Sequence, residues 1–252
     1  MQRSSCIQKW RDYLMLKFIG SGSAFNTKLG NNSAYYKVGN QMLLIDCGSN
    51  IFHRIKENSI LKGIEHIHVL VTHTHADHVG SLADLIFYSY YCHGEFAIPK
   101  VTVYYVDDVK INELLAINGI IPDIHCLTKK LHADTQYTLN FCKVLFEKSS
   151  HVEEIPSYSI EINIDNKHIY YTGDTNSLKS SLLNPESSKL YDYVYVDTCK
   201  ADYDGNVHLS LRKLSELVRH ELRSKFWCMH LDEGFERQEA EKLGFNVVTN
   251  EF

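Results

Sequence analysis

The segment His73-Thr74-His75-Ala76-Asp77-His78 constrains the fold of this chain more than any other stretch. It places four metal-binding side chains within six residues, directly after an apolar run at residues 69–71. Side chains alternate between the two faces of a strand, so His73 and His75 point to the same side. Imidazole and carboxylate ligands together suit zinc. A polar turn that happens to be His-rich is the alternative, and the dense spacing of the four ligands disfavours it.

Length and charge limit the classes of protein to consider. The 252 residues suffice for one large domain, and we assign residues 14–252 to it, with residues 1–13 as an N-terminal extension. That extension is charged and lacks a long apolar run, so we expect neither a signal peptide nor a membrane span. The formal charge of −5 disfavours a protein that grips long nucleic acid, but a small anionic substrate stays possible if a bound metal supplies positive charge.

The cysteine pattern indicates a reducing compartment. The chain has 7 Cys, an odd number, and none of them forms a Cys-x-x-Cys pair. Free thiols are therefore the simplest expectation, and we expect the protein in the cytoplasm.

Strands and helices alternate along much of the sequence. This pattern predicts an α/β protein with two mixed β-sheets sandwiched between helices, an αββα arrangement. Strands are expected at residues 14–19, 32–38, 41–46, 66–72, 101–106, 135–148, 158–164, 167–172, 191–197 and 226–230. Helices are expected at residues 51–62, 79–91, 107–117, 209–223 and 235–243, and Asp107 or Asp108 is expected to cap the third of them.

Several further polar residues stand at the ends of predicted strands. His151, Asp174 and His230 each follow an apolar strand pattern in the second half of the chain. Asp46 ends an earlier strand, within Asp46-Cys47-Gly48, and by itself it is equally compatible with a helix cap. A lone histidine in such a place is more often a surface or core residue, but these residues together match a metal-ligand set.

These motifs resemble the signature of the metallo-β-lactamase superfamily, and specifically its tRNase Z-like branch. The resemblance implies the metallo-β-lactamase fold and two Zn²⁺ ions, with Mn²⁺ possible. It also implies that Asp46 supports the ligands from behind. The implied ligands are His73, His75 and His151 for one metal, Asp77, His78 and His230 for the other, and Asp174 as the bridge between them.

The same resemblance suggests catalytic roles for three residues. Two bound cations would activate a water molecule and hold the oxygens of a phosphate, and Asp77 is expected to orient that water or accept its proton. His208 is the candidate acid for the leaving oxygen, with Asp197 to hold and polarise it. The alternative for His208 is an incidental histidine in a segment that caps the following helix.

The intervals between the candidate ligands narrow the choice among members of the tRNase Z-like branch. Only 23 residues separate His151 from Asp174, where the tRNA-processing relatives carry a protruding arm, and 22 residues follow His230. A compact, acidic member without an arm is similar to the anti-Pycsar phosphodiesterases of phages and bacteria. That similarity implies hydrolysis of 3',5'-cyclic nucleotides to 5'-monophosphates, in the host cytoplasm if the gene is phage-borne. A tRNA 3' endonuclease, a non-catalytic nucleotide-binding protein and a β-lactam or thioester hydrolase remain as alternatives.

The branch is also homodimeric, and we therefore expect a homodimer. Residues 85–91 and 96–99 form a Tyr-rich apolar segment that would suit the interface. Ordinary burial of a helix against the sheet is the alternative explanation for these apolar residues.

Overall fold

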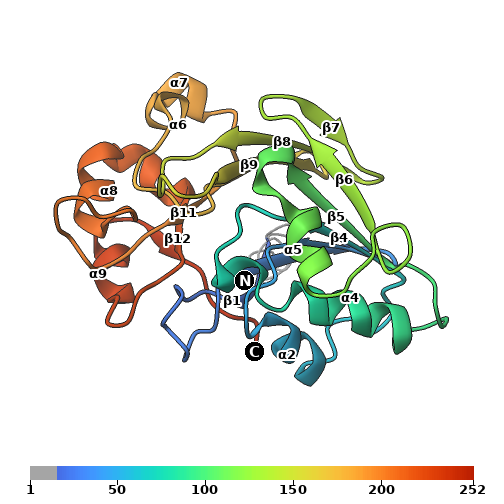
Figure 1. Ribbon diagram of the computed structural model, residues 1–252. Coiled ribbons are helices and arrows are strands. Elements are labelled where there is room, and N and C mark those ends of the chain that lie inside the picture. Colours follow the sequence, from blue (N-terminus) through green and yellow to red (C-terminus); the bar gives the residue numbers. More distant parts are fainter. Residues whose placement is uncertain (1–15) are drawn as a thin grey trace, which may run out of the picture.

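Two sheets lie face to face between two groups of helices in the computed structural model, which describes residues 16–252 (Figure 1). The predicted αββα architecture is therefore confirmed. The proposed extension at residues 1–13, and the start of the first predicted strand, lie outside the described residues. Within residues 16–252, no helix has both the length and the apolar character needed to cross a bilayer.

Each sheet mixes parallel and antiparallel strands and keeps its strands in chain order. The first sheet pairs its early strands antiparallel and its later ones parallel. Its members are β1 (Lys17–Gly20), β2 (Ser33–Val38), β3 (Gln41–Ile45), β4 (His66–Leu70), β5 (Val101–Val106) and β6 (Leu127–Leu131). The second sheet consists of β7 (Gln136–Thr138), β8 (Cys142–Lys148), β9 (Tyr158–Ile164), β10 (Lys167–Tyr171), β11 (Tyr193–Asp197), β12 (Phe226–Met229) and β13 (Asn246–Val247).

Helices cover the outer face of each sheet. The first sheet carries α2 (Ile51–Glu57), α4 (Leu82–Tyr91) and α5 (Ile111–Ile117), and the second carries α6 (Ser180–Leu183), α8 (Leu211–Leu217) and α9 (Arg237–Lys242) (Figure 1). Shorter pieces complete the set: α3 (Ala76–Val79), α7 (Pro185–Ser188), and the 3-10 turns η1 (Asp107–Val109) and η2 (His220–Lys225).

The central strands are apolar on both faces because both faces are covered. Tyr171 and Tyr195 pack into the core between the sheets, while their neighbours Tyr170 and Val196 pack under the helices of the second sheet. Successive residues of a strand point to opposite sides, so burial on both sides demands an almost continuous apolar run. These runs are the strands that the sequence predicted most accurately.

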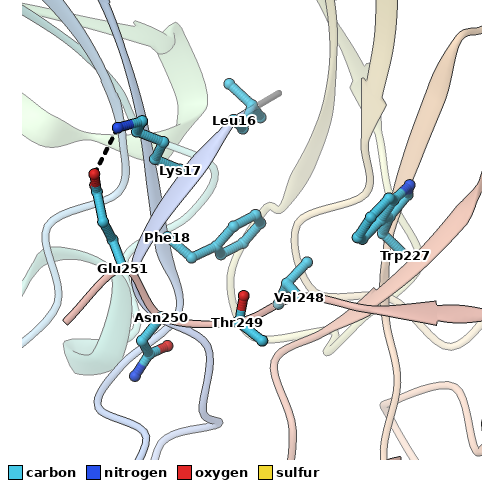
Figure 2. A pocket seen from close by; sticks show the side chains of 8 residues that line it. All are labelled: Leu16, Lys17, Phe18, Trp227, Val248, Thr249, Asn250 and Glu251. Atoms are coloured by element: carbon cyan, nitrogen blue, oxygen red, sulfur yellow. Dashed lines mark hydrogen bonds and ion pairs between the residues drawn. The ribbon is translucent and has the colours of Figure 1, made fainter. Parts of the chain in front are cut away.

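The chain ends of the described region meet at the edge of the molecule. Phe18 pairs with Asn250, the Glu251 amide donates to the Phe18 carbonyl at 2.9 Å, and Lys17 forms an ion pair with Glu251 (Figure 2). A small cavity of about 190 Å³ lies beside this contact, lined in part by Trp227 and Val248. None of the predicted ligands lines it, so this cavity is separate from the metal-ligand cluster.

Several predicted elements are shorter than expected. The helix expected at residues 79–91 begins only at Leu82, because Ser81 leaves the helical conformation, with φ of −117° and ψ of 15°. The strand expected at residues 135–148 splits into β7 and β8, because the Leu139 amide donates to the Cys142 carbonyl in a tight turn.

The helix expected at residues 107–117 begins later than predicted. Neither Asp107 nor Asp108 caps it; both lie in the 3-10 turn η1, and α5 starts after Lys110, whose φ is 56°. A left-handed residue cannot continue a right-handed helix, so the chain reorients at this point.

Candidate metal centre

The ends of four strands bring the predicted ligands to one site. His73, His151, Asp174 and His230 each follow the last residue of a strand by one to three positions. The strands concerned are β4 of the first sheet and β8, β10 and β12 of the second. A cluster at this edge therefore joins the two sheets, although its members lie far apart in the sequence.

The short helix α3 brings Asp77 and His78, the remaining ligands of the first motif, to the site. His75 is extended, with φ of −60° and ψ of 149°, and it precedes α3. Asp77 and His78 lie inside α3 and are buried, so this turn directs them toward the cluster.

Among the described residues, the potential ligand atoms form three groups that share Asp174; the two discussed first contain all the predicted ligands, and the third joins Asp174 and His230 to Asp197 and His208. In each group, the atoms all lie within 4.8 Å of one another. The first group is His73, His75, His151 and Asp174, and the second is Asp77, His78, Asp174 and His230. This is the division that the resemblance implied, with Asp174 common to both.

The distances between ligand atoms suit a coordinated cation. His75 Nδ1 lies 3.1 Å from His73 Nε2 and 3.3 Å from His151 Nε2. Nitrogen atoms bound tetrahedrally to zinc would lie about 3.3 Å apart, given the usual zinc–nitrogen bond lengths. In the second group, Asp77 Oδ2 lies 3.3 Å from His230 Nε2 and 3.4 Å from His78 Nε2.

Three buried atoms of the cluster lack a hydrogen-bond partner among residues 16–252: His78 Nε2, Asp174 Oδ1 and His230 Nδ1. The first two face each other and lie 3.2 Å apart. A buried polar atom without a partner is costly, and a cation coordinated by both atoms would remove that cost. The donor set and its unsatisfied atoms therefore fit metal ions.

The second nitrogen of two candidate ligand histidines is held by a fixed oxygen. His73 Nδ1 contacts Thr72 Oγ1 at 3.0 Å, and His151 Nδ1 contacts the Val207 carbonyl at 3.2 Å. His230 Nδ1 lies 3.3 Å from Asp197 Oδ1 but makes no hydrogen bond within residues 16–252. Such contacts orient the ring so that its other nitrogen faces the metal site.

Asp46 supports the cluster from behind. Its carboxylate accepts hydrogen bonds from His78 Nδ1, from the Thr72 amide and from the Thr72 hydroxyl, each at 2.8 Å. It does not cap α2, which follows Asn50. Thr72 thus connects Asp46 to two ligand histidines, a role that its sequence position alone did not reveal.

The electrostatics of the cluster also suit added positive charge. Burial would raise the pKa of Asp77 and of Asp174, but nearby histidines hold both pKa values well below the usual range. Burial disfavours the charged form of His230, yet Asp174 and Asp197 raise its pKa to about 10. Ionised carboxylates thus draw positive charge into a closed site, and divalent cations can supply it in place of protons.

His208 and Asp197 are also brought together beside the cluster. Asp197, the last residue of β11, is fully buried, and its Oδ2 accepts from His208 Nδ1 at 2.7 Å and from the Thr175 amide at 3.0 Å. Burial would lower the pKa of His208, but the charge and hydrogen bond of Asp197 raise it. The capping alternative also holds in part, because Ser210 accepts from the Lys213 amide and caps α8.

A cavity of about 730 Å³ opens onto this cluster. The ligands Asp77, His151 and His230 line it, together with His208. Among the described residues that line it there is no lysine and no arginine. Exposed Phe25 and Tyr203, which sequence reasoning did not single out, also line it; nothing distinguished them from the other aromatic residues of the chain.

Comparisons with known proteins find relatives over nearly the whole chain. The chain is 30% identical over 233 residues to the anti-Pycsar protein Apyc1 of Paenibacillus sp. (strain J14), covering 88% of this chain and 91% of that one. It is 27% identical over 238 residues to the Apyc1 protein of Bacillus phage BSP38, with 88% and 90% covered. Among solved structures, the metallo-β-lactamase fold protein YhfI from Bacillus subtilis superposes with a TM-score of 0.72 at 18% identity, over 94% of this chain and 96% of that chain.

The family described as "Anti-Pycsar protein Apyc1" matches residues 14–251. That match covers nearly all of the described chain and every ligand of the cluster. This chain is a hydrolase of the metallo-β-lactamase fold and belongs to the anti-Pycsar Apyc1 family.

Proposed function

We propose that this chain is a phosphodiesterase that binds two divalent metal ions and opens 3',5'-cyclic nucleotides such as cCMP, cUMP, cAMP and cGMP to 5'-monophosphates. In that role it would remove a cyclic-nucleotide signal that defends bacteria against phages, as the name of its family suggests. The observation that carries the proposal is the cavity, where a cluster of seven candidate metal ligands meets a pocket whose described lining has no lysine and no arginine.

Zn²⁺ is the metal we propose for both ligand groups, because imidazole nitrogen and carboxylate oxygen are its usual partners. Mn²⁺ is compatible with the same mixed ligands. When bound, the two ions would lower the pKa of a water molecule and neutralise charge on the phosphate. His73, His75 and His151 would hold one ion, Asp77, His78 and His230 the other, and Asp174 both.

Two side chains would move the protons. The Asp77 carboxylate lies at the cavity wall and would orient the attacking water and accept its proton. As the water oxygen bonds to phosphorus, the bond from phosphorus to the 3' oxygen breaks, and His208 would donate a proton to that oxygen. Asp197 would act as a positioning residue, because it fixes the His208 ring and favours its protonated form.

The charge of the cavity favours a small substrate over a long one. Proteins that bind a nucleic-acid strand neutralise many phosphates with lysine and arginine. The described lining of this cavity offers neither. A single phosphodiester carries one negative charge, which the metal ions can neutralise, so a cyclic mononucleotide fits this pocket better than the end of a tRNA.

We also propose a homodimer in the cytoplasm. Exposed apolar side chains gather beyond the end of α4: Tyr91 is 46% exposed, Phe96 is 69% exposed, and their ring centroids lie 6.0 Å apart. We call this surface the α4 patch, and it consists of Tyr91, Phe96 and Ile98, which is exposed and follows Phe96 by two residues. Exposed apolar side chains grouped in this way often mark an interaction site, and a second copy of the chain is the proposed partner. Free cysteines, six of them among residues 16–252, suit a reducing compartment.

The decisive test is product analysis with a trace of metal-loaded protein. It would be incubated with a panel of 3',5'-cyclic mononucleotides and, in parallel, with a tRNA precursor that carries a 3' trailer. We expect 5'-monophosphates and an untouched tRNA. Trailer removal with intact cyclic nucleotides would make the chain a tRNA 3' endonuclease, and stoichiometric binding without turnover would make it a nucleotide-binding protein.

A further inference from the structure

Two large aromatic side chains stand exposed at the cavity that leads to the metal centre. Phe25 is 85% exposed and Tyr203 is 60% exposed, and both line this cavity. Neither ring packs against another aromatic ring among residues 16–252. An exposed ring contributes little to folding, because burial of apolar surface is what stabilises the native state. Their place on the cavity wall therefore suggests a contact with a ligand.

The loop that carries Phe25 is fastened next to a metal ligand. The buried side chain of Asn26 donates to the carbonyls of Leu231 at 3.0 Å and Asp232 at 3.3 Å. The Ser23 amide also donates to the Leu231 carbonyl, at 3.0 Å. Because Leu231 directly follows His230, these bonds fix the base of the loop relative to the metal cluster.

The loop that carries Tyr203 is fastened to Asp232, one of the same two residues. The Asp232 carboxylate accepts from the Lys200 amide at 2.7 Å and from the Ala201 amide at 3.0 Å. Asn206 Nδ2 donates to the Ala201 carbonyl at 2.8 Å and so closes the loop on itself. Both aromatic residues thus lie on short loops that share one anchor, Asp232, two residues after His230.

The chemistry of the cavity indicates what these rings contact. A metal centre would neutralise one phosphodiester, and the described lining adds no lysine or arginine that would bind a second anion. The remainder of the ligand should therefore be neutral. A nucleobase is neutral and flat, and stacking on an aromatic side chain is the common way in which proteins bind one. The cavity, at about 730 Å³, lies in the range of small-molecule sites.

We infer that Phe25 and Tyr203 are the base-binding residues of this enzyme and hold the nucleobase of the substrate by stacking while its phosphate lies at the metal centre. This inference rests on the proposed phosphodiesterase function and adds to it the part of the protein that recognises the nucleoside. By this inference the two loops, rather than the metal cluster, distinguish a nucleotide from other phosphodiesters.

The test compares a cyclic nucleotide with a substrate that lacks the base, the methyl riboside of ribose 3',5'-cyclic phosphate. For the cyclic nucleotide, Phe25→Ala and Tyr203→Ala should each raise KM about 5- to 100-fold with kcat little changed. For the base-free substrate, both variants should match the wild type. Tyr203→Phe should restore the wild-type KM, because the ring remains.

Phe252→Ala is the matched control. Phe252 is 54% exposed and does not line this cavity, so its removal should change neither substrate's KM. The thermal midpoints of all these variants should equal that of the wild type, since each ring is exposed. An equal rise in KM for both substrates in the two alanine variants would overturn the base-binding assignment, and so would equal KM values of the wild type for both substrates. Either result would leave the phosphodiesterase function intact.

A binding measurement separates the two proposals. Calorimetry with metal-loaded protein would compare 5'-CMP and 5'-AMP with ribose 5-phosphate. Tighter binding of the nucleotides, lost in Phe25→Ala and Tyr203→Ala, supports the base-binding residues whether or not cyclic nucleotides are hydrolysed. Equal affinity for all three ligands would refute them. Absence of cyclic-nucleotide turnover, by contrast, would refute the proposed function alone.

Discussion

Asp174 is the side chain on which both ligand groups depend. Its Oδ1 lies 3.2 Å from His78 Nε2, and its Oδ2 lies 3.7 Å from His151 Nε2. We expect Asp174→Ala to lose at least one metal per chain and most of the hydrolytic activity, because the bridging carboxylate contributes a ligand to each site. Metal content measured by mass spectrometry checks this, with the exposed Asp204→Ala as control. Two retained metals with full activity would show that Asp174 does not bridge.

His208 should affect turnover without affecting metal content. If it protonates the leaving 3' oxygen, His208→Ala should reduce kcat on cyclic nucleotides by about 10²- to 10⁴-fold. A phosphodiester with a 4-nitrophenyl leaving group needs no such proton and should be hydrolysed almost normally by the variant. The exposed His132→Ala should behave as the wild type. Loss of metal from His208→Ala would instead identify His208 as a ligand or a structural residue.

The predictability of the site differed from residue to residue. That the candidate ligands lie together could be predicted, because strand ends with His or Asp after an apolar run are visible in the sequence. Thr72, Phe25 and Tyr203 could not, because their roles depend on neighbours distant in sequence: Asp46 for Thr72, and the Asp232 anchor for the two loops. A short side-chain contact of this kind leaves no periodic signal.

At the scale of elements, one half-buried ion network holds the second sheet to the segment before α6. Glu161 of β9 lies 3.1 Å from His168 Nε2 of β10 and also accepts from Lys179 and Tyr191. Burial alone would raise the pKa of Glu161, but these hydrogen bonds outweigh it and lower the pKa from 4.5 to about 2. The ionised form is therefore the one that the fold stabilises.

This lowered pKa predicts how the network responds to pH. A carboxylate with a depressed pKa stabilises the fold fully above about pH 4.5 and loses that contribution as the pH falls toward 2. Glu161→Gln should therefore reduce the free energy of unfolding by about 1 to 3 kcal/mol at pH 7. In urea titrations, the difference between the wild type and the variant should shrink from pH 5 to pH 3. A constant or growing difference would contradict this account, and the exposed Glu186→Gln should change stability by less than about 0.5 kcal/mol.

Element boundaries were harder to predict than the elements themselves. The edge strand β6 was missed because most of its residues are exposed and only Leu131 is buried, so it shows no apolar alternation. The helix expected to reach residue 223 ends at Leu217, because buried Val218 turns to an extended conformation with ψ of 118°. There, Arg223 donates to the Val218 carbonyl at 3.0 Å, a tertiary contact that helical periodicity does not reveal.

At the scale of the whole molecule, the surface beyond α4 should decide the oligomeric state. Inside α4, Leu85 and Ile86 are fully buried against the first sheet, as ordinary helix packing requires. By contrast, Tyr91 at the end of α4 is 46% exposed, and Phe96 beyond that end is 69% exposed. The predicted interface segment therefore combines two functions, with its inner residues in the core and its outer residues free to contact a second copy.

A charge introduced into the α4 patch should separate the copies. Phe96→Asp places a carboxylate where two apolar surfaces would meet, and a buried charge without a partner is strongly unfavourable. We expect light scattering to give a dimer for the wild type and a monomer for Phe96→Asp. Thermal midpoints of both proteins at low protein concentration would test separately whether the monomer is folded. Leu190→Asp, at a residue 66% exposed outside the patch, should remain dimeric. A monomeric wild type would contradict the proposed homodimer, and a dimeric Phe96→Asp would contradict an interface at the α4 patch. In either case the exposed apolar side chains would need a different partner to cover them.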